Sequence, residues 1–175
     1  MEPKPVTGLN VFKGTMAILP DIGRILKGIY YLASAKPDKH RSLGSMFETR
    51  AKQHPNKCFL RYREEQYTYG EFNQWANQLS HYLSSQGIKS GDIISLMMEN
   101  RPETIACVLA ITKLGGVVSM INNTQRDDTL VHSFTTVKAK MCIIGEECTE
   151  AFDAIKGRLD QDSTCKHFYM ADGNN

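Results

Sequence analysis

Three short apolar runs constrain the fold of this chain more than any other feature. They cover residues 93–98, 117–121 and 141–145, and each is followed by a segment with the apolar spacing of a helix. Runs of this length suit buried strands and are too short for most helices. Buried strands that alternate with helices favour a parallel sheet joined by right-handed crossovers. We therefore predict an α/β fold in which a parallel sheet of buried strands has flanking helices.

The segments around these strands carry local signals for helix ends and for one hairpin. Thr68 and Glu71 have the spacing of a capping box, which predicts a helix that begins after Thr68. Pro102 suits a first helical turn, and Gly115 ends the same helix. Residues 57–69 read as two short strands joined by a turn, which predicts an antiparallel hairpin near the start of the fold. Further helices are expected at 45–54, 127–137 and 149–159, and a fourth strand at 167–170.

The first 41 residues differ from the rest in charge and pattern. They hold seven Lys and Arg against three Asp and Glu, a net charge of +4, whereas residues 42–175 carry a net charge of −2. Apolar residues recur here at spacings of three and four, and Arg24 and Lys27 fall outside that stripe. The stripe consists of Ile18, Ile22, Ile25, Ile29 and Leu32. We predict an amphipathic helix and a linker over 1–41, and a separate α/β domain over 42–175.

The predicted N-terminal helix has two interpretations. Its apolar stripe and its cations would suit the surface of an anionic membrane. The same stripe would also suit packing against the body of the protein or a second copy, as most amphipathic helices do. Gly23 and Gly28 weaken the helix in isolation, so it needs a surface to fold against. We expect either peripheral membrane contact or self-association through this segment.

Composition and charge exclude several classes of protein. The net charge of +2 and the pI of about 8.2 give no basis for nucleic acid as the main partner. The five cysteines are odd in number and lack C-x-x-C spacing, which indicates reduced thiols in a cytosolic protein. No apolar run reaches the roughly 20 residues of a membrane span, and the first residues lack a signal-peptide pattern. We expect a cytoplasmic protein, free or peripheral to the inner face of a membrane.

The predicted site lies where parallel sheets bind ligands, at the carboxyl ends of the strands, in the loops after Met98, Ile121 and Gly145. The sequence has no glycine-rich phosphate loop, no G-x-S-x-G nucleophile motif and no H-E-x-x-H metal motif. Its five histidines lack metal-ligand spacing, so we predict no metal site. His132 falls near this edge, as a surface or packing residue of a helix or as a catalytic group.

Several motifs, taken in order, resemble the opening of an adenylate-forming enzyme. They are Ser45-Met46-Phe47-Glu48, Tyr67-Thr68-Tyr69-Gly70-Glu71-Phe72-Asn73, Gly87-Ile88-Lys89-Ser90-Gly91-Asp92, Asn100-Arg101-Pro102-Glu103 and Lys113-Leu114-Gly115-Gly116. The motifs at 100–103 and 113–116, in this order and at this separation, identify the family more specifically than either motif alone. The series covers about residues 43–145 and is most similar to the long-chain and very-long-chain acyl-CoA synthetases, including the fatty-acid transport proteins. The resemblance implies the N-terminal part of the large domain of such an enzyme.

The resemblance implies a two-step ligase, in which ATP and a fatty acid form an acyl-adenylate and the CoA thiol then displaces AMP. It implies ATP, Mg²⁺ and CoA as cofactors of a full-length enzyme, with none bound tightly by these 175 residues. The family's phosphate loop, adenine-binding segment, ribose-binding Asp and catalytic Lys have no counterpart here, so we assign no catalytic residue in this chain. We expect the chain to be the N-terminal piece of a longer enzyme and to be inactive alone.

By the same resemblance, the loop Asn122-Asn123-Thr124 is expected near the passage of the CoA pantetheine arm. Lys140 occupies a position where related enzymes often carry a cation that could meet a CoA phosphate. The structural alternatives are a tight turn for the loop and a solvated surface residue for the lysine.

Two alternative functions remain open at this point. One is another carboxylate-adenylating enzyme, such as an aryl or amino-acid adenylating domain, because the acyl-selecting pocket of the family lies mostly downstream. The other is a non-catalytic lipid-handling or membrane-docking module, which the basic amphipathic helix would suit. The reading frame beyond Asn175 would separate a ligase from such a module.

Overall fold

The computed structural model describes residues 19–34 and 42–159, and describes 166–170 as backbone. Its contacts divide the chain into two units, Met1–His40 and Arg41–Asn175, and each unit is treated by itself below. Ile18, the first residue of the predicted apolar stripe, and the predicted linker run at 36–41 lie outside the described residues. In the part of the chain that the structure describes, no helix combines the length and the apolar character needed to cross a membrane.

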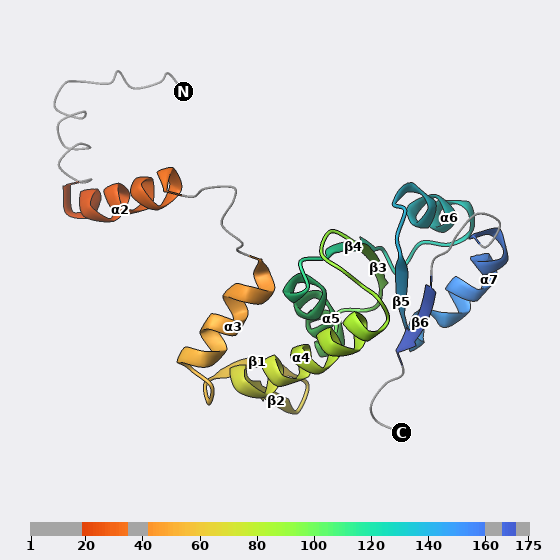
Figure 1. Ribbon diagram of the computed structural model, residues 1–175, viewed down its shortest axis with the longest axis horizontal. Helices are drawn as coiled ribbons and strands as arrows, with labels where there is room; N and C mark the ends of the chain where they lie inside the picture. The colour runs from red at the N-terminus through yellow and green to blue at the C-terminus, as the bar shows by residue number, and fades with distance from the viewer. Residues whose placement is uncertain (1–18, 35–41, 160–165, 171–175) are drawn as a thin grey trace, which may run out of the picture. The chain divides into compact units, whose positions relative to one another are not determined.

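In the first unit, a 3-10 turn (η1, Leu19–Asp21) leads into the helix α2 (Ile22–Ala33) (Figure 1). The predicted amphipathic helix is therefore present over its described length. None of its residues is buried. Arg24 Nη1 lies 3.0 Å from Asp21 Oδ1, an exposed ion pair at the first turn of the helix.

The second unit opens with helices and a hairpin. The elements in chain order are α3 (Leu43–Gln53), β1 (Cys58–Tyr62), β2 (Glu65–Thr68) and α4 (Tyr69–Ser85). The predicted antiparallel hairpin is confirmed, since β1 pairs antiparallel with β2. The capping box is confirmed as well: the Thr68 hydroxyl accepts the Glu71 N–H at 3.2 Å, and the Glu71 carboxylate accepts the Thr68 N–H at 2.9 Å. A second capping box, at Ser42 and Ser45, starts α3 two residues earlier than predicted.

The parallel sheet follows and has the order β4-β3-β5-β6 in the described residues. Its strands are β3 (Ile93–Met97), β4 (Val117–Ile121), β5 (Met141–Gly145) and β6 (Lys166–Met170). All three pairings are parallel. The connecting elements are α5 (Pro102–Lys113), α6 (Asp127–Thr136), the 3-10 turn η2 (Glu146–Cys148) and α7 (Thr149–Leu159). The predicted α/β fold with a parallel sheet is confirmed.

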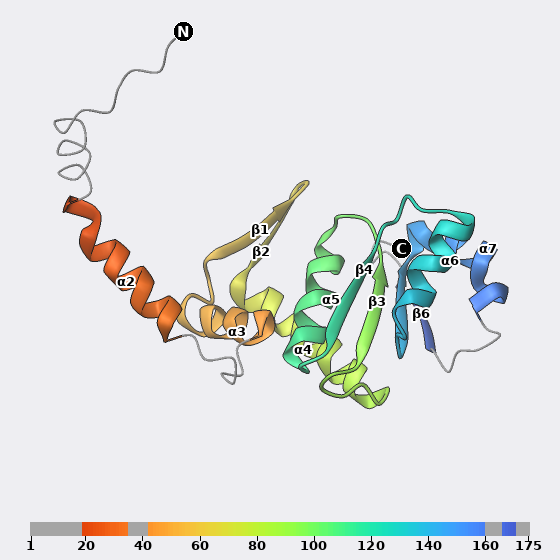
Figure 2. The ribbon, with the colours of Figure 1, turned by 90° about the horizontal axis from the view of Figure 1, so that it is seen from above.

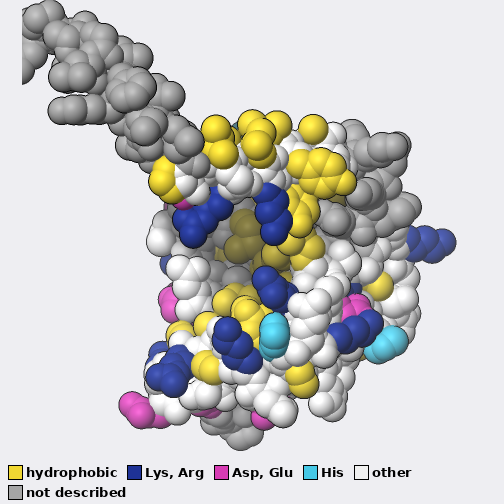
Figure 3. Space-filling model, turned by 90° about the vertical axis from the view of Figure 1, so that its left-hand side faces the viewer, with side chains coloured by type: hydrophobic (Ala, Val, Ile, Leu, Met, Phe, Trp, Pro, Cys, Tyr) yellow, Lys and Arg dark blue, Asp and Glu magenta, His cyan; other side chains and the backbone are white. Residues whose placement is uncertain are grey.

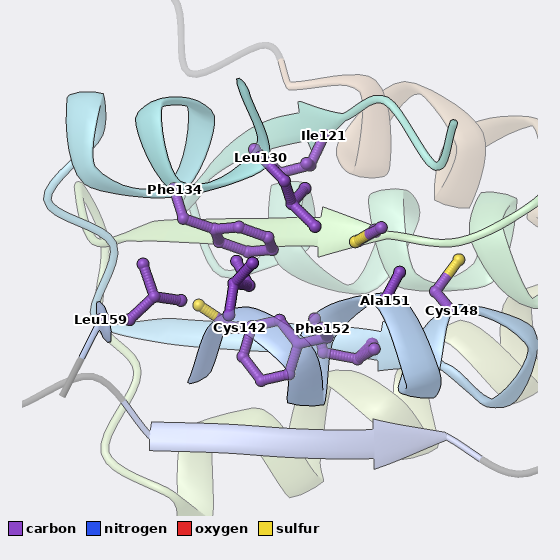
Figure 4. Packing of buried hydrophobic residues seen from close by; sticks show 11 residues of the cluster. Ile121, Leu130, Phe134, Cys142, Cys148, Ala151, Phe152 and Leu159 are labelled. Carbon is purple, nitrogen blue, oxygen red and sulfur yellow. The ribbon is translucent and has the colours of Figure 1, made fainter. Parts of the chain in front are cut away.

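Helices cover both faces of this sheet, and alternate residues of each strand point to opposite faces. Ile94, Leu96 and Ile143 pack on the face covered by α4 and α5 (Figure 2). Met97 and Ile144 pack on the other face, with side chains of α6 and α7 such as Phe134 and Phe152 (Figure 4). The sheet core is therefore closed on both sides, as parallel sheets require.

The strand β4 differs from its prediction. We predicted a buried strand at 117–121, but Val117 and Met120 are 50% and 57% exposed and only Ile121 is buried. The reason is its place in the sheet: in the described residues β4 is an edge strand, paired with β3 alone. Its apolar sequence suits a covered position, and nothing among the described residues covers its outer edge.

A third cluster joins α3 and α4 to α5. Its buried members are Phe47, Phe72, Ala76, Ala106 and Leu109. At the same junction Lys113 Nζ donates to Asn73 Oδ1 at 2.8 Å and lies 3.5 Å from Glu48 Oε2. Gly44 is required there, because a Cβ at this position would lie 2.6 Å from the Lys113 backbone nitrogen. The hairpin and the first two helices of the unit are thereby fixed onto the sheet.

Candidate functional site

The loops at the carboxyl edge of the sheet form the candidate site. They follow β3, β4 and β5, and parallel pairing brings these three strand ends to one edge. The predicted position of the site is based on this property of parallel sheets. The three loops differ in what holds them, and each is taken in turn.

The loop after β4 is held by its own hydrogen bonds. Asn122 Oδ1 accepts from the Thr124 N–H and from the Thr124 hydroxyl, each at 2.9 Å. Arg126 Nη1 donates to the carbonyls of Asn123 and Gln125 at 2.8 and 2.7 Å. Asn122 and Thr124 are exposed and Asn123 is half-buried. The loop is thus a preformed turn at the site edge, with Asn122 used to build the turn.

The loops after β3 and β5 are tied together by a buried arginine. Arg101, whose side chain is 9% exposed, lies 3.3 Å from Glu147 Oε2 through Nη2 and 3.7 Å from Glu103 Oε2 through Nε. Glu147 Oε1 accepts the Glu99 N–H at 2.6 Å. The Thr104 hydroxyl donates to the Glu99 carbonyl at 2.5 Å, which fixes that loop to the start of α5. Residues 100–103 therefore hold the loops after β3 and β5 in place at the carboxyl ends of these strands.

A cavity of about 550 Å³ lies between these loops and the turn of the hairpin. Its charged lining consists of Glu64, Glu65, Glu99, Glu103 and Glu147 against Arg63 and Arg101. Tyr67 also lines it and donates its hydroxyl to the Glu65 carboxylate, a bond that, together with burial, raises the pKa of Tyr67 to about 12. With this excess of carboxylates, the cavity is unsuited to a triphosphate, because the negative charges would repel one another.

No catalytic group was predicted, and the thiol at this edge is not suited to be one. Burial, followed by the charges of Glu147 and Glu99, raises the pKa of the Cys148 thiol to about 11. The thiolate, which is the nucleophilic form, is therefore scarce at neutral pH. Among the described residues, no three His, Cys, Asp or Glu side chains are grouped to hold a metal ion.

Lys140 lies at the amino ends of the parallel strands, whereas the loop Asn122-Asn123-Thr124 lies at their carboxyl ends. It directly precedes β5, and its Nζ donates to Asp92 Oδ2 at 2.6 Å and to the Gly87 carbonyl at 2.7 Å. The bond to Lys140 lowers the pKa of Asp92. A strand of five residues is roughly 16 Å long, so the structure does not bring the two predicted CoA-proximal positions together.

His132 lies on the surface of α6. It is exposed, and its Nε2 is 3.4 Å from the Thr136 hydroxyl one turn along the helix. These contacts are those of a helix-surface residue. The ion pair of Arg101 with Glu147 was missed from the sequence, although Pro102 had correctly predicted the helix that begins beside it.

The fold and its loop-lined edge place the chain among the α/β domains that bind ligands at the carboxyl ends of parallel strands. A family model described as AMP-binding enzyme matches residues 47–174. The chain therefore belongs to the AMP-binding enzymes, and its fold is that of the N-terminal domain of adenylate-forming enzymes. The resemblance drawn from the motifs is confirmed.

Individual relatives agree with this assignment. The medium/long-chain-fatty-acid–CoA ligase FadD6 of Mycobacterium tuberculosis is 31% identical over 148 residues, 83% of this chain and 25% of that protein. Long-chain fatty acid transport protein 2 of Rattus norvegicus is 29% identical over 136 residues, 77% of this chain and 22% of that protein. The structure of a Mycobacterium tuberculosis fatty acyl CoA synthetase matches with a TM-score of 0.68 and 26% identity, over 77% of this chain and 27% of that one. The chain spans about a quarter of the length of these relatives.

Proposed function

We propose that this chain is the N-terminal part of a ligase that joins a fatty acid to CoA through an acyl-adenylate. The observation that carries the proposal is the similarity over 83% of the chain to a ligase named for medium- and long-chain fatty acids. The same similarity supports ATP, Mg²⁺ and CoA as the cofactors of the whole enzyme.

The residues of this chain would hold the ligand-binding loops in place and would take no part in the chemical steps. The Arg101–Glu147 pair holds the loops after β3 and β5, and the loop after β4 is held by its own bonds. A preformed edge reduces the ordering cost of binding a ligand. Because carboxylates dominate the cavity at this edge and repel phosphate groups, the triphosphate of ATP would be bound by other parts of the enzyme. We assign no catalytic step to these residues.

For CoA, the proposal is confined to the loop Asn122-Asn123-Thr124. Its place at the carboxyl edge supports contact with the pantetheine arm, whose amides can pair with uncharged polar groups. The opposite position of Lys140, and its bonds to Asp92 and Gly87, do not support a shared role in the same contact.

The test of the function uses the protein encoded by the complete reading frame that contains this chain. Pyrophosphate release is measured with oleate, with an aryl acid and with an amino acid, and thioester formation is measured after CoA is added. We expect release with oleate and conversion to oleoyl-CoA, and no pyrophosphate release from the 175-residue chain alone. Release with the aryl or amino acid only, or a reading frame that encodes no adenylating activity, would overturn the proposal.

The test of the loop uses Asn123→Ala in the same full-length enzyme. Loss of one uncharged hydrogen bond is expected to raise the KM for CoA by roughly twofold to tenfold. Pyrophosphate exchange with oleate, which reports the first step, should be unchanged. Asn56→Ala, in the exposed turn after α3, is the matched control. An unchanged KM for CoA in Asn123→Ala would exclude the side chain from the CoA site.

A further inference from the structure

The helix α2 presents an uncovered apolar face. This face, here called the apolar face of α2, consists of Ile22, Ile25, Leu26, Ile29 and Leu32, with exposed fractions from 45% to 78%. At about 3.6 residues per turn, these five side chains project from one side of the helix. Arg24, Lys27 and Tyr31 project from the other side, and Tyr30 lies at the border between the two. Figure 3, the view from the left-hand side of Figure 1, shows hydrophobic side chains in yellow and Lys and Arg side chains in dark blue at the molecular surface.

We propose that the apolar face of α2 docks in the surface of a membrane that contains anionic lipid. In this arrangement the helix lies in the plane of the interface, with its five aliphatic side chains among the acyl chains. Its length of roughly 18 Å is too short to cross a bilayer core. Arg24 and Lys27 then face the water side of the interface, within range of the attraction of the lipid phosphates. Tyr30 lies at the level of the headgroups, where aromatic side chains are enriched.

Charge favours lipid over a second protein surface. The first 41 residues carry a net charge of +4, and α2 itself contains no Asp or Glu. Asp21 pairs with Arg24, but the two side chains are 56% and 88% exposed, so this pair is weak and leaves the guanidinium open to a phosphate. An excess of cations beside an apolar stripe matches the negative surface potential of a membrane. A second copy of α2 would offer no such match, since the helix contains no carboxylate to pair with these cations.

The second unit offers no large apolar surface in its described residues. Its exposed large hydrophobic side chains are spread over three elements, α3, α4 and β4. They are Leu43, Met46, Tyr82, Val117 and Met120. A helix of 12 residues with an uncovered apolar stripe is marginal in water, so an external surface has to stabilise it. A lipid interface supplies that surface without a complementary groove.

The test is flotation of the purified chain with two kinds of vesicle, phosphatidylcholine alone and phosphatidylcholine mixed with phosphatidylserine. No ATP or CoA is present, so the outcome is independent of the proposed ligase function. We expect the wild-type chain to float with the mixed vesicles and added salt to weaken this binding. Arg24→Glu/Lys27→Glu should reduce the bound fraction at least tenfold, and Ile25→Ser/Ile29→Ser should abolish binding.

The matched control is Lys57→Glu/Lys138→Glu, which makes the same change in net charge at two exposed positions of the second unit. This variant should bind as the wild type does. Equal loss of binding in both charge variants would overturn the proposal, because net charge alone would then explain the effect. So would wild-type binding that is absent or insensitive to phosphatidylserine. A wild-type dimer in light scattering that Ile25→Ser/Ile29→Ser converts to monomer, without vesicle binding, would assign the face to a second copy instead.

Discussion

Leu109→Ala tests whether the hairpin and the first helices of the second unit are fixed to the sheet as the structure shows. Leu109 is 2% exposed and belongs to the cluster that joins α3, α4 and α5. The substitution removes the Cγ and both Cδ carbons, which is worth about 2.4 kcal/mol of transfer free energy. Leu109 shares its cluster with the buried rings of Phe47 and Phe72, which we expect to limit the collapse of the gap, so the cavity adds to this loss. The expected loss is about 3–4 kcal/mol, within the range of about 2–5 kcal/mol for such substitutions.

Urea unfolding followed by far-UV circular dichroism measures this loss. With a slope of about 1–3 kcal/mol per molar urea, the midpoint should fall by roughly 1–4 M. Leu43→Ala is the matched control, since Leu43 is a leucine at the start of α3 that is 56% exposed. Its midpoint should change by less than about 0.5 M. If Leu109→Ala and Leu43→Ala have the same midpoint, the inner face of α5 does not pack as described.

Two further predictions concern polar groups of the sheet. The Ser95 hydroxyl is fully buried and has no hydrogen-bond partner in the described residues. Ser95→Ala should therefore raise the free energy of unfolding by about 1 kcal/mol. A lower urea midpoint in this variant would show that the hydroxyl is hydrogen-bonded in solution. Because Lys140 lowers the pKa of Asp92, their pair stabilises the fold above about pH 4, and this contribution is lost as the pH falls. The urea midpoint of Lys140→Met should therefore fall less than that of the wild type between about pH 6 and pH 3, and equal falls would contradict the pairing.

Most of the second unit could be predicted from local patterns. The apolar runs at 93–98 and 141–145 became buried strands, and the capping box at Thr68 became the start of α4. These signals are local, because a strand buried on both faces needs an apolar run and a helix start needs a cap. The exposure of β4 could not be predicted in the same way. Its apolar residues show that the strand suits a covered position, but the sequence does not show whether the covering segment is among these residues.

The candidate site was predicted less completely than the fold. The carboxyl edge follows from parallel pairing, so the loop after Ile121 could be placed in advance. Lys140 directly precedes the strand at 141–145, and this order alone would have placed it at the amino edge. The pairing of Arg101 with Glu147 had no signal, because it joins two loops that only the register of β3 with β5 brings together.

The motifs that identify the family act mainly in folding. Phe47 and Phe72 pack in the cluster beneath the hairpin, Lys113 joins α5 to α4 through Asn73, and Arg101 ties two loops together. Selection of a fatty acid requires a cavity with apolar walls, because an acyl chain gains binding energy by leaving water. The cavity at this edge is lined mostly by charged side chains and does not meet that requirement. These residues therefore connect the chain to adenylate-forming enzymes through its architecture, and the choice of acid in the proposed ligase has to be made by other residues.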